Sequence, residues 1–191
     1  MARPKSEDKR SAILTAAISV LAERGLAATP TSAISKAAGV AEGTLFTYFK
    51  TKDDLVNALY REIKMEMADL LLSSYPHRAN VRRKFQHIWD FYVNWGVANP
   101  QKSQVMQQLS VAAQITEASR AAGYAPFAEL EKTALDAIAA KELQPYPVAF
   151  IAATMESLAK TTMAFMAHDP DSAERFRASG FDVFWNGIAY R

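Results

Sequence analysis

The sequence contains no cysteine and little of what a β-structure requires. Without cysteine the chain can form no disulfide, thiolate nucleophile or Cys-ligated metal site, which is typical of a protein from a reducing compartment. Only seven of the 191 residues are glycine, and no run of β-branched residues alternates with polar ones. Half of the residues are hydrophobic and 22% are charged, as in soluble proteins of one or two domains. These features exclude a disordered chain and predict an all-α fold.

Two apolar segments, residues 11–22 and 148–167, raise the question of membrane targeting. Two acidic residues just before the first segment, and the helical spacing within it, argue against a signal peptide. The second segment contains Glu156 and Lys160, and each charge at the centre of a membrane span costs roughly 2.5–3.5 kcal/mol. We therefore expect a cytoplasmic protein with no membrane partner.

Charge is distributed unevenly along the chain. Residues 1–52 carry eight Lys or Arg against four Asp or Glu, whereas residues 53–191 carry fourteen against sixteen. The front of the chain is therefore basic and the rest slightly acidic. This asymmetry predicts a small front module that binds an anionic partner, attached to a larger body that does not.

Four helices are predicted at the start of the chain: three that form the helix-turn-helix domain and a long fourth helix that follows them. The spacing of hydrophobic residues, and the glycine and proline residues that interrupt helices, give the bounds 8–24, 32–38, 42–49 and 52–74. Gly25 and Gly39 suit the left-handed position after a helix end, and Thr31 is predicted to cap the second helix. Thr51, followed three residues later by Asp54, forms a variant capping box for the fourth helix.

The second and third of these helices have the pattern of a helix-turn-helix. Leu45 and Phe49 share one face and are predicted to be buried. Short side chains and a glycine on the outer face let the backbone approach base edges, where threonine hydroxyls can form hydrogen bonds. Lys52 adds a cation in the first turn of the next helix, where free backbone N–H groups already favour phosphate. The third helix is therefore predicted to lie in a DNA major groove.

The run AISKAAGVAEGTLFTYFKTKDDL, residues 33–55, resembles the DNA-binding signature of the TetR family. The resemblance implies a helix-turn-helix DNA-binding domain, residues 1–60, before a larger helical effector-binding and dimerisation domain, residues 61–191, with about nine helices in total. It also implies a homodimeric transcriptional regulator, usually a repressor, that leaves a palindromic operator in double-stranded DNA when a small molecule occupies the C-terminal domain. No cofactor is implied.

Two groups of DNA-binding residues follow from the resemblance. The positions that match phosphate contacts are Thr31, Tyr48, Thr51 and Lys52. The positions that match base-facing residues are Gly43, Thr44 and Thr47. Lys36 and Glu42 complete the predicted set.

Three positions depart from the family pattern. Phe46 stands where tyrosine is common, so a phenolic hydroxyl is missing there. Ala41 replaces a frequent serine N-cap, which is expected to weaken the recognition helix by roughly 1 kcal/mol. Glu42 stands where lysine is common, and it either accepts a hydrogen bond from cytosine N4 or complements the helix dipole.

The basic N-terminal tail leaves two alternatives open. Its cations are Arg3, Lys5, Lys9 and Arg10. They either follow the DNA backbone and enter a minor groove, or they form a solvated terminus without a role in DNA binding.

The body of the chain is rich in large apolar residues, most of which are expected in its core. A subset could line a cavity for an apolar or aromatic effector, and the candidates are Trp89, Tyr92, Met106, Tyr124, Phe127 and Met155. Candidate polar contacts are His87, Gln107 and Gln114. The family resemblance alone places the pocket in this region, and for each residue ordinary core packing is the alternative.

The last two predicted helices, residues 146–167 and 171–190, are expected to join two subunits in a four-helix bundle. The apolar stripe on the first comprises Val148, Ile151, Met155, Leu158 and Thr162. Small residues that let a partner helix approach are Ala149, Ala152, Ala153 and Ala159. The second helix offers Phe176, Val183, Phe184, Gly187 and Ile188. The alternative is that these stripes only close the core of the monomer.

The sequence carries no recognisable catalytic or metal-binding constellation. Its three histidines lie far apart, and HExxH, GxSxG, Walker and GxGxxG patterns are absent. His87 and Asp90 share a helix face, either as an acid–base pair or as an ordinary hydrogen-bonded pair. We therefore expect a regulator and not an enzyme. A role as an activator, or as a DNA-binding protein outside transcription, is the alternative.

Overall fold

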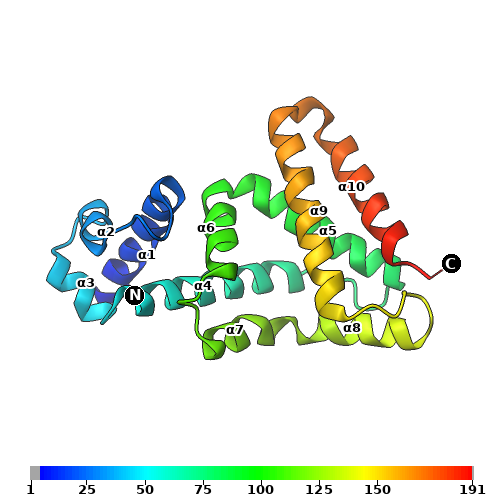
Figure 1. Cartoon of the computed structure of the whole chain (residues 1–191), viewed down its shortest axis with the longest axis horizontal. Coiled ribbons are helices and arrows are strands. Elements are labelled where there is room, and N and C mark those ends of the chain that lie inside the picture. Colours follow the sequence, from blue (N-terminus) through cyan, green and yellow to red (C-terminus); the bar gives the residue numbers. More distant parts are fainter. Residues whose placement is uncertain (1–4, 191) are drawn as a thin grey trace. The chain divides into compact units, whose positions relative to one another are not determined.

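The computed structural model describes residues 5–190, with side chains from Glu7 onward. This part of the chain folds into ten α-helices and two short 3-10 helices without a β-strand (Figure 1). The bounds are α1 (Lys5–Arg24), α2 (Thr31–Ala37), α3 (Glu42–Tyr48), α4 (Lys52–Leu72), α5 (Val81–Ala98), α6 (Pro100–Val111), α7 (Glu117–Tyr124), η1 (Ala125–Phe127), α8 (Ala128–Ala139), α9 (Val148–His168), η2 (Pro170–Ser172) and α10 (Ala173–Ile188). The predicted all-α fold with an N-terminal helix-turn-helix is confirmed, with one α-helix more than the approximate expectation.

The helices pack into two compact units that do not follow chain order. The first unit comprises the chain up to Glu66 together with Pro100–Ala125, and the second comprises Met67–Asn99 together with the chain from Pro126 onward. Helix α4 contributes to both units. These units are defined by compact packing, whereas the predicted boundary at residue 60 separates a DNA-binding from an effector-binding domain. That boundary stays a prediction.

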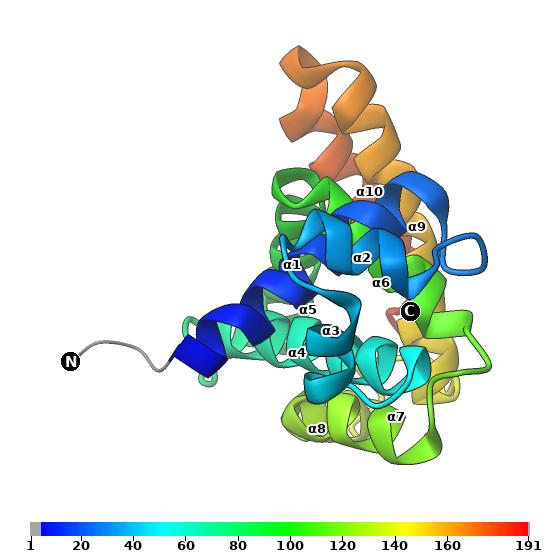
Figure 2. The ribbon, with the colours of Figure 1, turned by 90° about the vertical axis from the view of Figure 1, so that its left-hand side faces the viewer.

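The first unit is built on contacts among α1, α2 and α3, which Figure 2 shows grouped together, and α6 also packs against α1. Ile13, Ile34 and Leu45 from these three helices are completely buried. Gly25 and Gly39 follow α1 and α2 with φ angles of +81° and +67°, as expected for residues that end a helix in the left-handed region. These two turns fix where α2 and α3 begin.

The helix caps differ in part from the predictions. Thr51 Oγ1 accepts a hydrogen bond from the Asp54 N–H at 3.0 Å, so the predicted capping box of α4 is confirmed. Thr31 does not cap α2, because Pro30 is the N-cap and Thr31 is already the first helical residue. The N-cap of α3 is Ala41, and no side chain caps this helix. The N-terminus of α3 therefore lacks a side-chain cap, as the alanine at this position predicts, and the expected loss of helix stability stays a prediction.

The second unit packs α5, α9 and α10 against one another (Figure 1). At their centre Trp89 is completely buried, its indole N–H donates to the Arg177 carbonyl at 3.0 Å, and its ring stacks on Phe184. Phe85 and Val93 are buried on the same helix, as the apolar pattern of α5 predicts. No helix in the described range combines the length and apolar character that crossing a bilayer demands.

Candidate nucleic-acid interface and an adjoining cavity

Helix α3 presents a buried and an exposed face. Leu45 is 0% exposed and Phe49, directly after the helix, is 4% exposed. On the opposite side Gly43 and Thr47 are exposed, and Thr44 and Tyr48 are partly exposed. A Cβ on Gly43 would meet no atom within 4 Å, so this side of the helix is open. The outer face therefore carries the short side chains that close approach to base edges requires.

A hydrogen bond joins the starts of α2 and α3. The Thr31 hydroxyl donates to Glu42 Oε1 at 2.7 Å, and both side chains are solvent-accessible. The carboxylate of Glu42 also lies in the first turn of α3, where it complements the helix dipole. The structure thus gives Glu42 an intramolecular partner while leaving its other carboxylate oxygen available for a base.

Lys52 occupies the corner between the α1–α2 turn and α4. Its ammonium group donates to the Leu26 carbonyl at 2.6 Å and is only partly exposed. Together with Thr31 and Phe46 it lines an open hollow of about 620 Å³. Two predicted phosphate contacts therefore lie at one hollow, and the apolar ring of Phe46 forms part of its wall. Lys36 and Thr51 are exposed outside this hollow.

The basic tail is only partly described. Arg3 and the side chain of Lys5 lie outside the described residues, and Lys9 is exposed on α1. Arg10 forms an ion pair with Glu62, and its guanidinium lies 5.6 Å from the centre of the Phe49 ring. Arg10 therefore joins α1 to α4, a contact that neither alternative for the tail anticipated.

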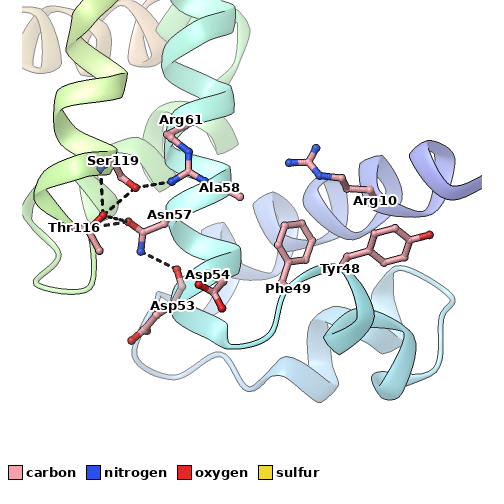
Figure 3. Close-up of a pocket in the computed structure, with 10 residues that line it drawn as sticks. All are labelled: Arg10, Tyr48, Phe49, Asp53, Asp54, Asn57, Ala58, Arg61, Thr116 and Ser119. Atoms are coloured by element: carbon pink, nitrogen blue, oxygen red, sulfur yellow. Dashed lines mark hydrogen bonds between the residues drawn. The ribbon is translucent and has the colours of Figure 1, made fainter.

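A second cavity, of about 400 Å³, adjoins the end of α3 (Figure 3). Arg10 of α1 and the last residues of the helix-turn-helix, Tyr48 and Phe49, line it. Its remaining lining residues come from α4 and from the start of α7, and they are Asp53, Asp54, Asn57, Ala58, Arg61, Thr116 and Ser119. Sequence reasoning missed this site, because α4 and α7 meet only in the folded chain.

Asn57 holds the α7 side of this cavity in place. It is buried, and its amide group donates to the carbonyls of Asp53 and Gln114, each at 2.8 Å. Its Oδ1 accepts from the Thr116 backbone N–H at 2.9 Å. Thr116 in turn caps α7 by accepting from the Ser119 N–H. The network fixes the α6–α7 loop on α4 and uses both the nitrogen and the oxygen of the Asn57 side-chain amide (Figure 3).

The six predicted effector contacts fall in two different units. Met106 and Tyr124 belong to the first unit, whereas Trp89, Tyr92, Phe127 and Met155 belong to the second. Tyr124 is 56% exposed beside Lys64, and Trp89 is a core residue. None of the six lines either cavity described above. Their role in effector binding stays a prediction.

The indole N–H of Trp95, in the second unit, is a polar group that the sequence predictions did not single out. Its side chain is buried, and its indole N–H has no hydrogen-bond partner among the described residues. A buried donor of this kind costs about 1–3 kcal/mol unless an acceptor reaches it. No sequence signal distinguished Trp95 from the other aromatic residues of α5.

The predicted dimer stripes point in part into the monomer. Ile151, Ala159 and Thr162 of α9 are buried, as are Phe184 and Ile188 of α10, so these assignments were wrong. A helix with apolar residues on several faces gives no indication of which face its own subunit covers. Five members of the predicted sets, Ala149, Ala152, Ala153, Val183 and Gly187, are exposed, and their role in a dimer stays a prediction. Phe150 and Phe165 are each more than half exposed on α9 and were not in the predicted sets.

His87 and Asp90, which the sequence placed together on one helix face, each contact a different group. His87 Nε2 lies 3.0 Å from the Leu71 carbonyl, and Asp90 lies 3.6 Å from Arg177 Nε. Burial raises the pKa of Asp90, and the Arg177 charge opposes that rise. The described residues hold no group of three metal-ligating side chains.

Residues 13–59 match the sequence profile of the family described as bacterial regulatory proteins, tetR family. The solved structure of a protein from Shewanella sp. PV-4, assigned to the tetR family of transcription regulators, superposes with a TM-score of 0.86 and 27% identity. That superposition covers 96% of this chain and 99% of the other. Residues 13–59 therefore carry a DNA-binding domain of the tetR family, and the fold of the chain matches that of a tetR-family regulator.

Other relatives match this chain over a shorter stretch or show the fold alone. The fatty acid metabolism regulator protein of Bacillus subtilis (strain 168) is 35% identical over 72 residues, which are 38% of this chain and 37% of that protein. The chain therefore aligns with little more than a third of that curated relative. A regulator from Marinobacter aquaeolei VT8 superposes over the full length of both chains with a TM-score of 0.88 and 21% identity.

Proposed function

We propose that this protein is a TetR-family regulator, namely a cytoplasmic, ligand-responsive transcriptional repressor that binds a palindromic operator as a dimer. The outer face of α3 is the observation that carries the proposal. Gly43, Thr44 and Thr47 form an open surface of short side chains, and Thr31 and Lys52 flank it at one hollow. Such a helix fits a major groove while the Lys52 ammonium, which keeps donors beyond the one it gives to the Leu26 carbonyl, holds a phosphate.

The outward faces of α9 and α10 support the dimer. Phe150, Phe165 and Val183 are exposed by 59%, 55% and 61%, and exposed alanines and a glycine accompany them. Exposed apolar faces of this kind on two neighbouring helices are typical of an interface. Two copies joined through these helices would form a four-helix bundle, and their recognition helices would enter grooves about 34–36 Å apart.

An apolar or aromatic small molecule is proposed to release the protein from DNA. A Bacillus subtilis transcriptional regulator that superposes with a TM-score of 0.71 and 19% identity was solved in complex with stearoyl-CoA. In the present chain the buried indole N–H of Trp95 would donate a hydrogen bond to a polar acceptor group of such an effector. Any effector acts only through its different affinities for the DNA-binding and free conformations.

Selection from a random double-stranded DNA pool at two salt concentrations tests the proposed function. We expect a palindromic site whose half-sites lie one helical turn, or a multiple of it, apart. The selection is repeated with protein that was unfolded and refolded, to remove any molecule carried through purification. Enrichment of no site in both preparations would contradict sequence-specific binding.

Lys52→Ala is expected to weaken binding to every DNA sequence by a similar factor. Removal of one phosphate contact should reduce the slope of log affinity against log salt by about 1. Thr44→Ala should instead change the preference at one or two base pairs. Both effects are measured by fluorescence anisotropy on the selected site over a salt series.

The control for this prediction is Lys132→Ala, a matched change on α8, where Lys132 pairs with Asp136. It should leave both the affinity and the salt slope unchanged. Because Lys52 also holds the Leu26 carbonyl, the unfolding midpoint of each variant is measured as well. A Lys52→Ala protein that is folded and keeps the wild-type salt slope would contradict the phosphate assignment.

A further inference from the structure

The cavity in Figure 3 is distinct from the predicted groove-binding surface. Of the nine predicted DNA-binding residues only Tyr48 lines it, joined by Arg10 of the basic tail, and none of the predicted effector contacts does. Asp54, Asn57, Ala58 and Arg61 lie three or four residues apart, so they form one face of α4. Its volume of about 400 Å³ is in the range of small-molecule sites.

Arg61 is a cation in this cavity without an acidic partner. Its side chain is partly buried, and Nη1 donates to the Ser119 hydroxyl at 2.5 Å. No carboxylate among the described residues forms an ion pair with it. Arg10, the other arginine of the cavity, is already paired with Glu62. The remaining guanidinium donors of Arg61 therefore favour an incoming anionic group, with the Thr116 and Ser119 hydroxyls beside it.

Negative charge lies at the other end of the same helix face. Asp54 accepts from the Thr51 hydroxyl at 2.9 Å, and Asp53 precedes it. Seven residues of α-helix separate Asp54 from Arg61, which is roughly 10 Å along the helix axis. Phe49 and Ala58 contribute apolar surface to the same cavity. The cavity therefore offers an acidic end, an apolar wall and a basic end.

We propose that this cavity binds a small zwitterionic molecule whose two charges are several bonds apart, such as a dipeptide or a linear ω-amino acid. Its carboxylate pairs with Arg61, its ammonium group pairs with Asp54, and the carbons between them pack on Phe49 and Ala58. The site takes a different chemical class from the apolar effector discussed above. It also adjoins Tyr48, at the end of the recognition helix.

Isothermal titration calorimetry on the full chain without DNA tests the site with a series of linear amino acids. The probes are glycine, β-alanine, γ-aminobutyrate, aminohexanoate and aminooctanoate, in which only the distance between the charges changes. We expect the affinity to peak at one length and to fall on either side of it. A carboxylate and an amine of that length, each without the second charge, should bind at least about tenfold more weakly.

Two variants test which residues pair with the carboxylate and with the ammonium group of the probe. Arg61→Gln, and Asp54→Asn, which retains a side-chain oxygen for the α4 cap, should each lower the affinity for the best probe by about tenfold or more. Arg78→Gln is the control for Arg61→Gln, because Arg78 is exposed in the second unit and the net charge changes equally. Unfolding midpoints measured without probe verify that each variant is folded.

Three results would each overturn the proposal: no probe binding in the millimolar range, a simple carboxylate binding as well as the zwitterion, or an Arg61→Gln protein with unchanged affinity. No DNA is present in these titrations. Failure to select an operator would therefore leave this site intact, and failure of the titrations would leave the proposed DNA binding intact.

Discussion

Gly180→Ala is expected to lower the free energy of unfolding by about 2–3 kcal/mol, through overpacking of the second unit. A Cβ at this position of α10 would lie 2.6 Å from Cζ2 of Trp89 and would also collide with Oγ1 of Thr162. Trp89 is completely buried and held by its hydrogen bond to Arg177, and Thr162 is buried on α9. The intrinsic helix preference for alanine over glycine, about 1 kcal/mol, is too small to compensate. Urea denaturation followed by tryptophan fluorescence measures the change.

Gly43→Ala is the control for this substitution. It makes the same change in a helix where the added carbon meets no atom within 4 Å, so stability should stay unchanged or rise by up to about 1 kcal/mol. Adding Thr162→Ala to Gly180→Ala should restore part of the loss, because it removes one of the two collisions. A Gly180→Ala protein with the wild-type midpoint would show that α5, α9 and α10 do not pack so closely.

Val183→Glu is expected to convert the proposed dimer into a monomer of 21.1 kDa. Val183 is 61% exposed in the single subunit, so a glutamate there remains solvated and the fold is retained. In the proposed four-helix bundle the same side chain would bury two charges near the two-fold axis, which is costly without partners. Sedimentation equilibrium measures the mass. Operator affinity should fall on the order of 100-fold, because the two recognition helices are no longer linked.

Val111→Glu provides the matched control for the dimer prediction. Val111 ends α6 in the first unit and is 83% exposed, so the same substitution adds the same charge away from α9 and α10. This variant should keep the wild-type mass and operator affinity. If Val183→Glu and the wild type sediment alike, the subunits associate through another surface or not at all.

The helix-turn-helix could be predicted from the sequence because its determinants are local. Gly25 and Gly39 adopt the backbone conformation that ends α1 and α2, and the spacing of Leu45 and Phe49 defines the buried face of α3. The capping box of α4 likewise depends on two residues in one turn. The cap of α2 was placed one residue too late, since Pro30 takes the N-cap position that the sequence pattern gave to Thr31.

The dimer faces of α9 and α10 were harder to predict for a physical reason. Alanine and other apolar residues surround both helices, so periodicity does not tell an inward face from an outward one. Packing against α5 decided that Ile151 and Phe184 close the subunit core and that Phe165 and Val183 remain outside. The effector candidates met the same limit, because large apolar side chains are equally suited to a core and to a pocket wall.

The sequence by itself therefore determined the all-helical class, the position of the recognition helix and the residues on its outer face. Each of these depends on residues within one or two helical turns, whose spacing the linear order preserves. The tertiary structure alone decided which apolar faces remain exposed, that Thr31 contacts Glu42, and that Arg61 meets Ser119 in a cavity beside α3. Thr31 and Glu42 are 11 positions apart in the sequence, and Arg61 and Ser119 are 58 positions apart. Only the packing of helices against one another brings the members of each pair together.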